Sequence, residues 1–231
     1  YHDTWGVELS DELVILTQIH FSEAGFYVDR VKKLAIPPKL IVKGEVRDLD
    51  AVVESIRAEL GEGGFTATDL VITIQTSQFV KRLEPFTFST MDVLMSQLEV
   101  RLTESSRFAE VPFSMGFQKP SDPIEKSQTV WPVLYAGFPQ ESVDMLCDMA
   151  SALDLHLVAI DLASQGIQRA IFWGQKSYFS QYVFSIIIEN HYMELLVRFN
   201  DHVIFHHIVW YNFLDIEEDE RRSFYSFESE I

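Results

Sequence analysis

Two short polar turns carry the side chains of this sequence that could bind a nucleotide. The first follows an apolar stretch near the N-terminus and offers Glu8 and Ser10, and the second offers Glu189 and Asn190. A phosphate loop holds its anion with backbone N–H groups, and an acidic side chain beside it can hold Mg²⁺. The two turns could therefore be the two halves of a metal–nucleotide site.

The same turns lack features that a working phosphate loop needs. Neither contains glycine, which lets the backbone approach an anion closely, and neither has a lysine or arginine beside its glutamate. The further carboxylates of Asp11, Glu12 and Glu194 would repel a triphosphate, by about 4 kcal/mol for two unit charges about 4 Å apart at an intermediate dielectric. We therefore expect degenerate nucleotide loops and no cofactor, with a residual Mg-ATP site as the alternative.

The remaining reactive side chains do not form a catalytic pattern. His206 and His207 point to opposite faces of a strand, and His202 lies about 13 Å from His206 at roughly 3.3 Å per residue, so one strand cannot place all three on one metal ion. Pairing with His191 across the turn stays open, but surface histidines are favoured. Cys147 falls on the apolar stripe of its predicted helix, which favours a buried structural thiol.

Composition and charge limit the partners. With 231 residues, 47% hydrophobic and 23% charged, the sequence is typical of a soluble globular protein with a substantial core. The formal net charge of -17 argues against binding to nucleic acid or to anionic lipid, since both need a basic face. No apolar run reaches the roughly 18 residues that span a bilayer, and the start of the sequence does not predict a signal peptide. A single cysteine suits a reducing compartment.

The elements that position the two turns are meanders at opposite ends of the chain. Alternating apolar residues predict strands over residues 5–8, 13–19 and 26–31, and again over 183–188, 192–199 and 202–209. The two meanders are of similar size. This internal echo favours a duplicated lobe.

Between the meanders the pattern alternates between helices and strands. Asp48 is expected to cap a helix with an apolar stripe from Leu49 to Leu60, a second helix turns Met91, Leu94, Met95, Leu98 and Leu102 inward, and Pro139 opens a third. Residues 70–74 and 79–83 are expected to pair as a hairpin. Further strands are predicted over 111–117 and 129–138, a buried strand over 155–161, and a helix over the acidic tail, 215–231.

The order of these elements resembles the PilM family, actin-like cytoplasmic proteins of type IV pilus assembly that are similar in fold to the cell-division protein FtsA. The stretches that carry the resemblance are WGVELS at 5–10, IVKGEVRD at 41–48, LVITI at 70–74, FVKRL at 79–83, VLYAG at 133–137 and LHLVAID at 155–161. They extend over nearly the whole chain. The cytoplasmic domain of GspL-type proteins of type II secretion is the second family that the order resembles.

The resemblance implies an α+β chain with an actin-like (ASKHA) fold. It assigns residues 1–64 and 154–176 to subdomain 1A, residues 65–153 to an inserted, SHS2-like subdomain 1C, and residues 177–231 to part of subdomain 2A with an acidic C-terminal helix. Family members continue through a further subdomain that carries an adenosine-binding loop. The second lobe is therefore expected to be truncated or incomplete.

The resemblance also implies a function without catalysis. The family takes the extended N-terminal tail of a membrane-anchored, PilN-like partner in the groove between 1A and 1C, so we expect a scaffold. The contact is expected near Val71, Thr73 and Phe79, and on the helix that carries Leu94 and Leu98. The alternative is an actin-like ATPase that binds Mg-ATP between its lobes.

The same resemblance gives the expected partners and location. A PilN-like or GspL-like inner-membrane protein is the first partner, and an assembly ATPase or a second copy of the chain are further candidates. Neither nucleic acid, nor a metal ion, nor direct insertion into a membrane is expected. The protein would be cytoplasmic and peripheral to the inner membrane through its partner.

Overall fold

The computed structural model of the chain describes residues 3–11, 13–23, 25–63, 67–76, 78–105, 108–118, 130–163, 166–167, 182–188, 192–199 and 202–210. The chain divides into two compact units, Tyr1–Gln175 and Lys176–Ile231. The predicted C-terminal helix over 215–231 lies outside the described residues.

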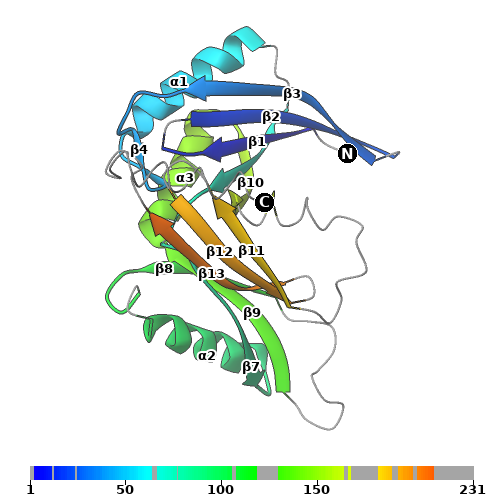
Figure 1. Ribbon diagram of the computed structural model, residues 1–231, viewed down its shortest axis with the longest axis vertical. Coiled ribbons are helices and arrows are strands. Elements are labelled where there is room, and N and C mark those ends of the chain that lie inside the picture. The colour runs from blue at the N-terminus through cyan, green and yellow to red at the C-terminus, as the bar shows by residue number, and fades with distance from the viewer. Residues whose placement is uncertain are drawn as a thin grey trace, which may run out of the picture. The chain divides into compact units, whose positions relative to one another are not determined.

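The first unit contains a five-stranded sheet (Figure 1). Its order is β10-β6-β1-β2-β3, with β1 at Thr4–Leu9, β2 at Leu13–Ser22, β3 at Gly25–Ala35, β6 at Asp69–Ile74 and β10 at His156–Leu162. The first three strands form the antiparallel meander that the sequence predicts. Strands β6 and β10 run parallel to β1, which makes the sheet mixed.

Two helices cover one face of this sheet. α1 at Leu49–Gly63 joins β1–β3 to β6, and α3 at Gln140–Ala152 leads into β10. Right-handed crossovers that progress in one direction across a sheet place their helices on the same face. The core contains Val52, Val53 and Ile56 of α1 together with Leu146 and Met149 of α3, all at most 5% exposed.

Local signals for these helices are confirmed, but two burial expectations are wrong. The Asp48 Oδ1 atom accepts a hydrogen bond from the Ala51 N–H at 3.0 Å and caps α1. Cys147 is exposed, because the buried stripe of α3 runs through Leu146, Met149 and Ala150 and leaves Cys147 beside it. Strand β10 is not fully buried either: three of its seven residues are exposed and three are half-buried, because it is an edge strand that pairs with β6 alone among the described strands.

A smaller sheet follows the first. It has the order β7-β9-β8, with β7 at Val80–Thr87, β8 at Phe113–Gln118 and β9 at Val130–Pro139, all antiparallel. The predicted hairpin of residues 70–74 with 79–83 is wrong, because β6 pairs with β1 and β10 whereas β7 pairs with β9. An apolar run of this length contains no signal that selects its partner. The small sheet extends from β7 to β9, and the expected limits of the inserted subdomain, residues 65 and 153, stay a prediction.

The second core lies between this sheet and α2, at Met91–Thr103. The Thr90 side chain caps α2 by accepting from the Val93 N–H at 3.4 Å. Leu94, Leu98 and Leu102 are fully buried, but Met91 and Met95 are exposed, because one stripe at a spacing of four residues faces the sheet. These leucines pack against other buried side chains, Phe86, Phe108, Val133 and Tyr135. Burial is the largest cause that raises the pKa of Tyr135 to about 12, and the nearby carboxylate of Glu84 is the second.

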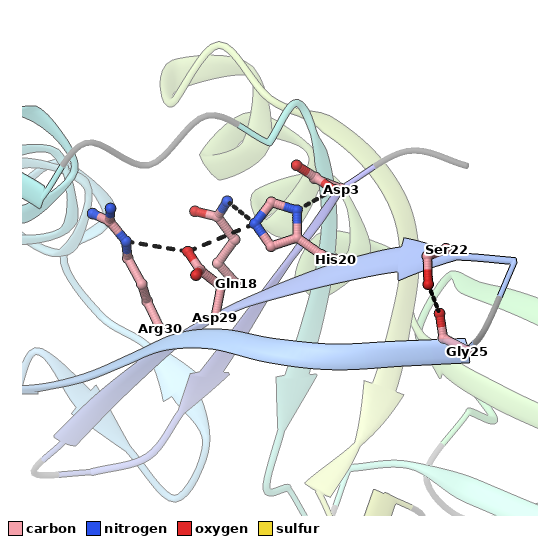
Figure 2. A network of polar contacts seen from close by, with 7 residues as sticks. All are labelled: Asp3, Gln18, His20, Ser22, Gly25, Asp29 and Arg30. Carbon is pink, nitrogen blue, oxygen red and sulfur yellow. Dashed lines mark hydrogen bonds and ion pairs between the residues drawn. The ribbon is translucent and has the colours of Figure 1, made fainter.

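A network of polar contacts joins the start of β1 to the β2–β3 hairpin (Figure 2). The His20 ring lies between two carboxylates, with Nδ1 2.5 Å from Asp3 Oδ1 and Nε2 3.6 Å from Asp29 Oδ2. Gln18 Nε2 lies 3.3 Å from His20 Nε2. The register of the pair shifts by one residue between Gln18 and Ile19, so this network holds the hairpin where its ladder is irregular.

The second unit contains the second predicted meander. β11 at Tyr182–Ile188, β12 at Tyr192–Phe199 and β13 at His202–Trp210 form an antiparallel sheet in that order. The prediction of three strands in this region is confirmed. One face carries exposed apolar side chains from β11, namely Tyr182, Phe184, Ile186 and Ile188.

A short ribbon fixes the chain between β3 and α1. β4 at Ile41–Val42 pairs with β5 at Glu45–Val46 across a turn in which Lys43 and Gly44 both have positive φ, at 53° and 76°. A Cβ atom on Gly44 would lie 1.7 Å from the Gln75 carbonyl oxygen. The residue after β6 therefore packs directly on this turn, and only glycine fits there.

We expect Gly44→Ala to lower the free energy of unfolding by about 2–4 kcal/mol, because the added methyl group forces the turn away from Gln75. Urea denaturation measures the change. The matched control is Gly116→Ala in β8, where a Cβ would meet no atom within 4 Å. That variant should stay within about 1 kcal/mol of the parent, and equal losses in both variants would contradict the packing argument.

Candidate functional site

The first predicted nucleotide loop is the turn between β1 and β2. Glu8 is half-buried within β1. The Ser10 N–H and the Ser10 hydroxyl both donate to the Leu13 carbonyl oxygen, at 3.0 Å and 2.8 Å. Both donors of Ser10 are therefore used to close the turn.

A backbone cradle does exist nearby, and a carboxylate of the chain fills it. Asp11 accepts from the Lys43 N–H at 2.9 Å and from the Gly44 N–H at 3.1 Å. Successive residues with left-handed backbone point their N–H groups to one side and make a small anion site. The Asp11 carboxylate occupies this site. Its role here is to tie the β1–β2 turn to the β4–β5 turn.

The second predicted loop, with Glu189 and Asn190, lies outside the described residues and stays a prediction. Within the described part of the chain, no group of three or more histidine, cysteine, aspartate or glutamate side chains could hold a metal ion. A search of the same residues finds no helix that is long and apolar enough to cross a membrane.

An apolar pocket of about 320 Å³ lies where the two sheets of the first unit meet. The edge strand of each sheet contributes to it, β10 from the first and β8 from the second. The carboxyl ends of β6 and β10 form one wall, a position at which sheets with parallel strands commonly bind ligands. Its larger apolar side chains are Ile74, Phe79, Phe138, Val143, Ile160 and Leu162.

Small residues make the floor of this pocket. Gly116 of β8 lies opposite Ala136 of β9 in the antiparallel register, and both line the pocket. The adjacent Gly137 faces the other way, because a Cβ there would lie 2.9 Å from Leu102 Cδ2. The pocket is therefore on the side of the small sheet away from α2. Asp161 adds a single carboxylate to its wall.

The predicted partner-binding residues divide into three groups. Phe79 lines the pocket. Val71 and Thr73 are half-buried in β6 and are not among its lining residues, and the Thr73 hydroxyl donates to the Val7 carbonyl oxygen at 3.5 Å. Leu94 and Leu98 are 0% exposed in the second core, so neither offers a surface to a partner. The physical reason is that the apolar stripe of α2 is needed to bury the small sheet.

Sequence patterns alone did not indicate Gly116 and Ala136 as pocket residues. The one available signal was a glycine inside a predicted strand, which weakens the strand and often marks a place where another backbone or a ligand approaches closely. The depth of the pocket could not be inferred from it, since that depends on the distance between two sheets.

Two other hollows flank the small sheet. One, of about 580 Å³, adjoins the start of β8 and is lined by Glu141, Asp144 and Asp148 of α3, all exposed. Gln140 bridges the lining residues of this hollow and of the apolar pocket by hydrogen bonds. Its Nε2 donates to Asp144 Oδ1 at 2.7 Å, and its Oε1 accepts from the Ser114 hydroxyl at 2.6 Å. The other, of about 800 Å³, lies between β7 and the outer side of α2 and has mixed charges.

Comparison with known proteins supports the fold. No protein-family model matches this sequence, and no curated protein matches it. The solved structure of the PilM-PilN type IV pilus biogenesis complex contains a chain that is similar to this one, with a TM-score of 0.75 and 17% identity over 96% of this chain. The match covers 65% of that chain, so the present chain spans about two thirds of the length of this relative.

Two further structures are similar. One is the cytoplasmic domain of EpsL, an inner membrane component of the type II secretion system of Vibrio cholerae, with a TM-score of 0.51, 10% identity, and coverage of 90% of this chain and 70% of that chain. The other is a protein of unknown function from Bacteroides thetaiotaomicron with an actin-like ATPase fold, with a TM-score of 0.48, 10% identity, and coverage of 99% and 76%. The chain is an α+β protein, and its fold is similar to that of the PilM chain and, second, to that of the cytoplasmic domain of EpsL.

Proposed function

We propose that this chain is a non-catalytic scaffold of a type IV pilus or type II secretion assembly platform. It binds the extended cytoplasmic tail of a PilN-like or GspL-like inner-membrane protein in the apolar pocket between β8 and β10. The protein is cytoplasmic and reaches the membrane through this partner. The observation that carries the proposal is an open apolar pocket between two edge strands on a fold similar to that of PilM.

The chemistry of the pocket supports an apolar peptide as its ligand. Phe79, Val143 and Ile160 line the pocket, are half-buried and offer aliphatic and aromatic surface. Among the described residues, Asp161 is the single charged side chain that lines the pocket. A peptide gains affinity there by burying alternate apolar side chains, as peptides do in grooves between secondary-structure elements. The PilM chain is part of a complex with PilN, which makes a PilN-like tail the first peptide to test.

Gly116→Leu tests the pocket. A Cβ at this position meets no atom within 4 Å, so the leucine side chain extends into the pocket without disturbing the sheet. We expect affinity for a fluorescein-labelled peptide with the N-terminal sequence of the PilN-like protein from the same genome to fall at least about tenfold, or about 1.4 kcal/mol. Fluorescence anisotropy provides the measurement.

The matched control is Ser96→Leu, which adds the same bulk to the hollow beside α2 on the opposite side of the small sheet. That variant should bind the peptide as the parent does. A peptide that binds Gly116→Leu as tightly as the parent protein would assign its site to another surface and end this proposal.

The alternative function, an actin-like ATPase, is tested with the nucleotide itself. We expect Mg-ATP to bind more weakly than about 1 mM in isothermal titration, because Asp11 occupies the N–H groups of Lys43 and Gly44 and places a negative charge at the first turn. Titration of the peptide into the same sample shows that the protein is competent. Micromolar affinity for Mg-ATP would replace the scaffold by the nucleotide-binding alternative.

A further inference from the structure

The two edge strands of the small sheet, β7 and β8, differ in whether they can pair with a further strand. Antiparallel pairs alternate between hydrogen-bonded and non-hydrogen-bonded residues. The Gln140 N–H donates to the Pro112 carbonyl oxygen at 2.9 Å, which sets the phase of the β8–β9 ladder. Ser114 and Gly116 are then the bonded partners of Phe138 and Ala136. The intervening β8 residues, Phe113, Met115 and Phe117, point their backbone N–H and C=O groups to the outer edge, where no strand of the described residues pairs with β8.

The edge of β7 is protected by its sequence. The same phase places Lys81, Leu83, Pro85 and Thr87 on the outer edge of this strand. Pro85 has no N–H to offer, and the Thr87 carbonyl oxygen accepts from Gln97 Nε2 at 3.2 Å. Proline and lysine on an edge strand are devices that prevent pairing with another chain. This edge of the sheet is closed to an added strand.

The edge of β8 carries no such device. Its outward residues are two phenylalanines and a methionine, and no proline lies between Phe113 and Gln118. Their side chains pack toward the second core, which fixes the strand in place. The backbone edge of β8 therefore lies at the rim of the apolar pocket and can pair with a further strand.

We propose that the partner tail binds as a strand added to β8, antiparallel to it, with alternate apolar side chains in the pocket and a basic segment over the acidic hollow at the start of β8. This inference rests on the proposed function and specifies how that site binds its ligand. An added strand gains affinity from backbone hydrogen bonds, and the pocket supplies side-chain selectivity.

The direction follows from charge. Positive residues of an inner-membrane protein accumulate on the cytoplasmic side, next to its membrane span. In an N-terminal cytoplasmic tail they therefore follow the apolar anchors in sequence. The acidic residues Glu141, Asp144 and Asp148 line the hollow together with Val111 and Pro112, at the N-terminal end of β8. A tail whose C-terminal part lies at the N-terminal end of β8 runs antiparallel to it.

Amide hydrogen exchange measured by NMR on the full chain tests the added strand. In the free protein, the amides of Met115 and Phe117 should exchange fast, and those of Ser114 and Gly116 slowly. At saturation with the PilN-like peptide, exchange at Met115 and Phe117 should slow at least about tenfold. The outward amide of Leu83 on β7 is the internal control and should not change.

Each other outcome of this experiment overturns the inference. Peptide that binds by anisotropy while Met115 and Phe117 keep their free exchange rates would retain the proposed function and remove the added strand. Absence of peptide binding would overturn both. Protection of Met115 and Phe117 that appears without peptide and rises with protein concentration would assign the edge to a second copy of this chain.

Two peptides with the same apolar core test the direction, one with a Lys-Lys pair at its C-terminal end and one with the pair at its N-terminal end. The first should bind at least about threefold tighter at low salt. This preference should disappear in the double variant Glu141→Lys, Asp148→Lys, and it should persist in the control Asp92→Lys, Glu104→Lys, which alters the hollow beside α2. The opposite preference would mean a parallel strand and overturn the orientation.

Discussion

The parallel pairing of β6 between β1 and β10 is the constraint on which the first unit depends. Leu70, Ile72 and Ile74 of β6 are at most 2% exposed and pack in the core beneath α1 and α3. The connection through α1 ends at β6, and the connection that contains the small sheet and α3 begins there. The C-terminal end of β6 therefore determines where the small sheet begins. The pocket exists because β6 ends at Ile74 beside the edge of β10, and the chain then continues through Phe79 into β7.

A small anion site at the β4–β5 turn is filled by a carboxylate from the turn between β1 and β2. Lys43 and Gly44 point two N–H groups toward one place, and Asp11 fills it with a carboxylate of the same chain. Gly44 in turn packs on Gln75, directly after β6. The Asp11 carboxylate, which would compete with a bound phosphate, therefore links the β1–β2 turn to the β4–β5 turn. The β4–β5 turn packs on the end of β6, which forms part of the pocket wall.

Much of the local structure could be predicted from the sequence, and the reasons are local. Asp48 and Thr90 cap their helices because their side chains reach the first free N–H groups. Both meanders were expected from alternation with a period of two. The pairing of residues 70–74 with 79–83 and the burial of Cys147 were predicted wrongly, whereas the inward position of Leu94 and Leu98 was predicted correctly. Each of these predictions depends on which element packs on which face.

Local signals were enough to predict the three helices α1 to α3, both meanders, the acidic character and the order that resembles PilM, since caps, periodicity and charge act over a few residues. Three features depend instead on how distant segments pack: the pocket bordered by β8 and β10, its floor of Gly116 and Ala136, and the difference between the two edges of the small sheet. Strand pairing joins residues far apart in the chain, and the phase of a ladder depends on contacts such as that of Gln140 with Pro112. No local pattern encodes that phase.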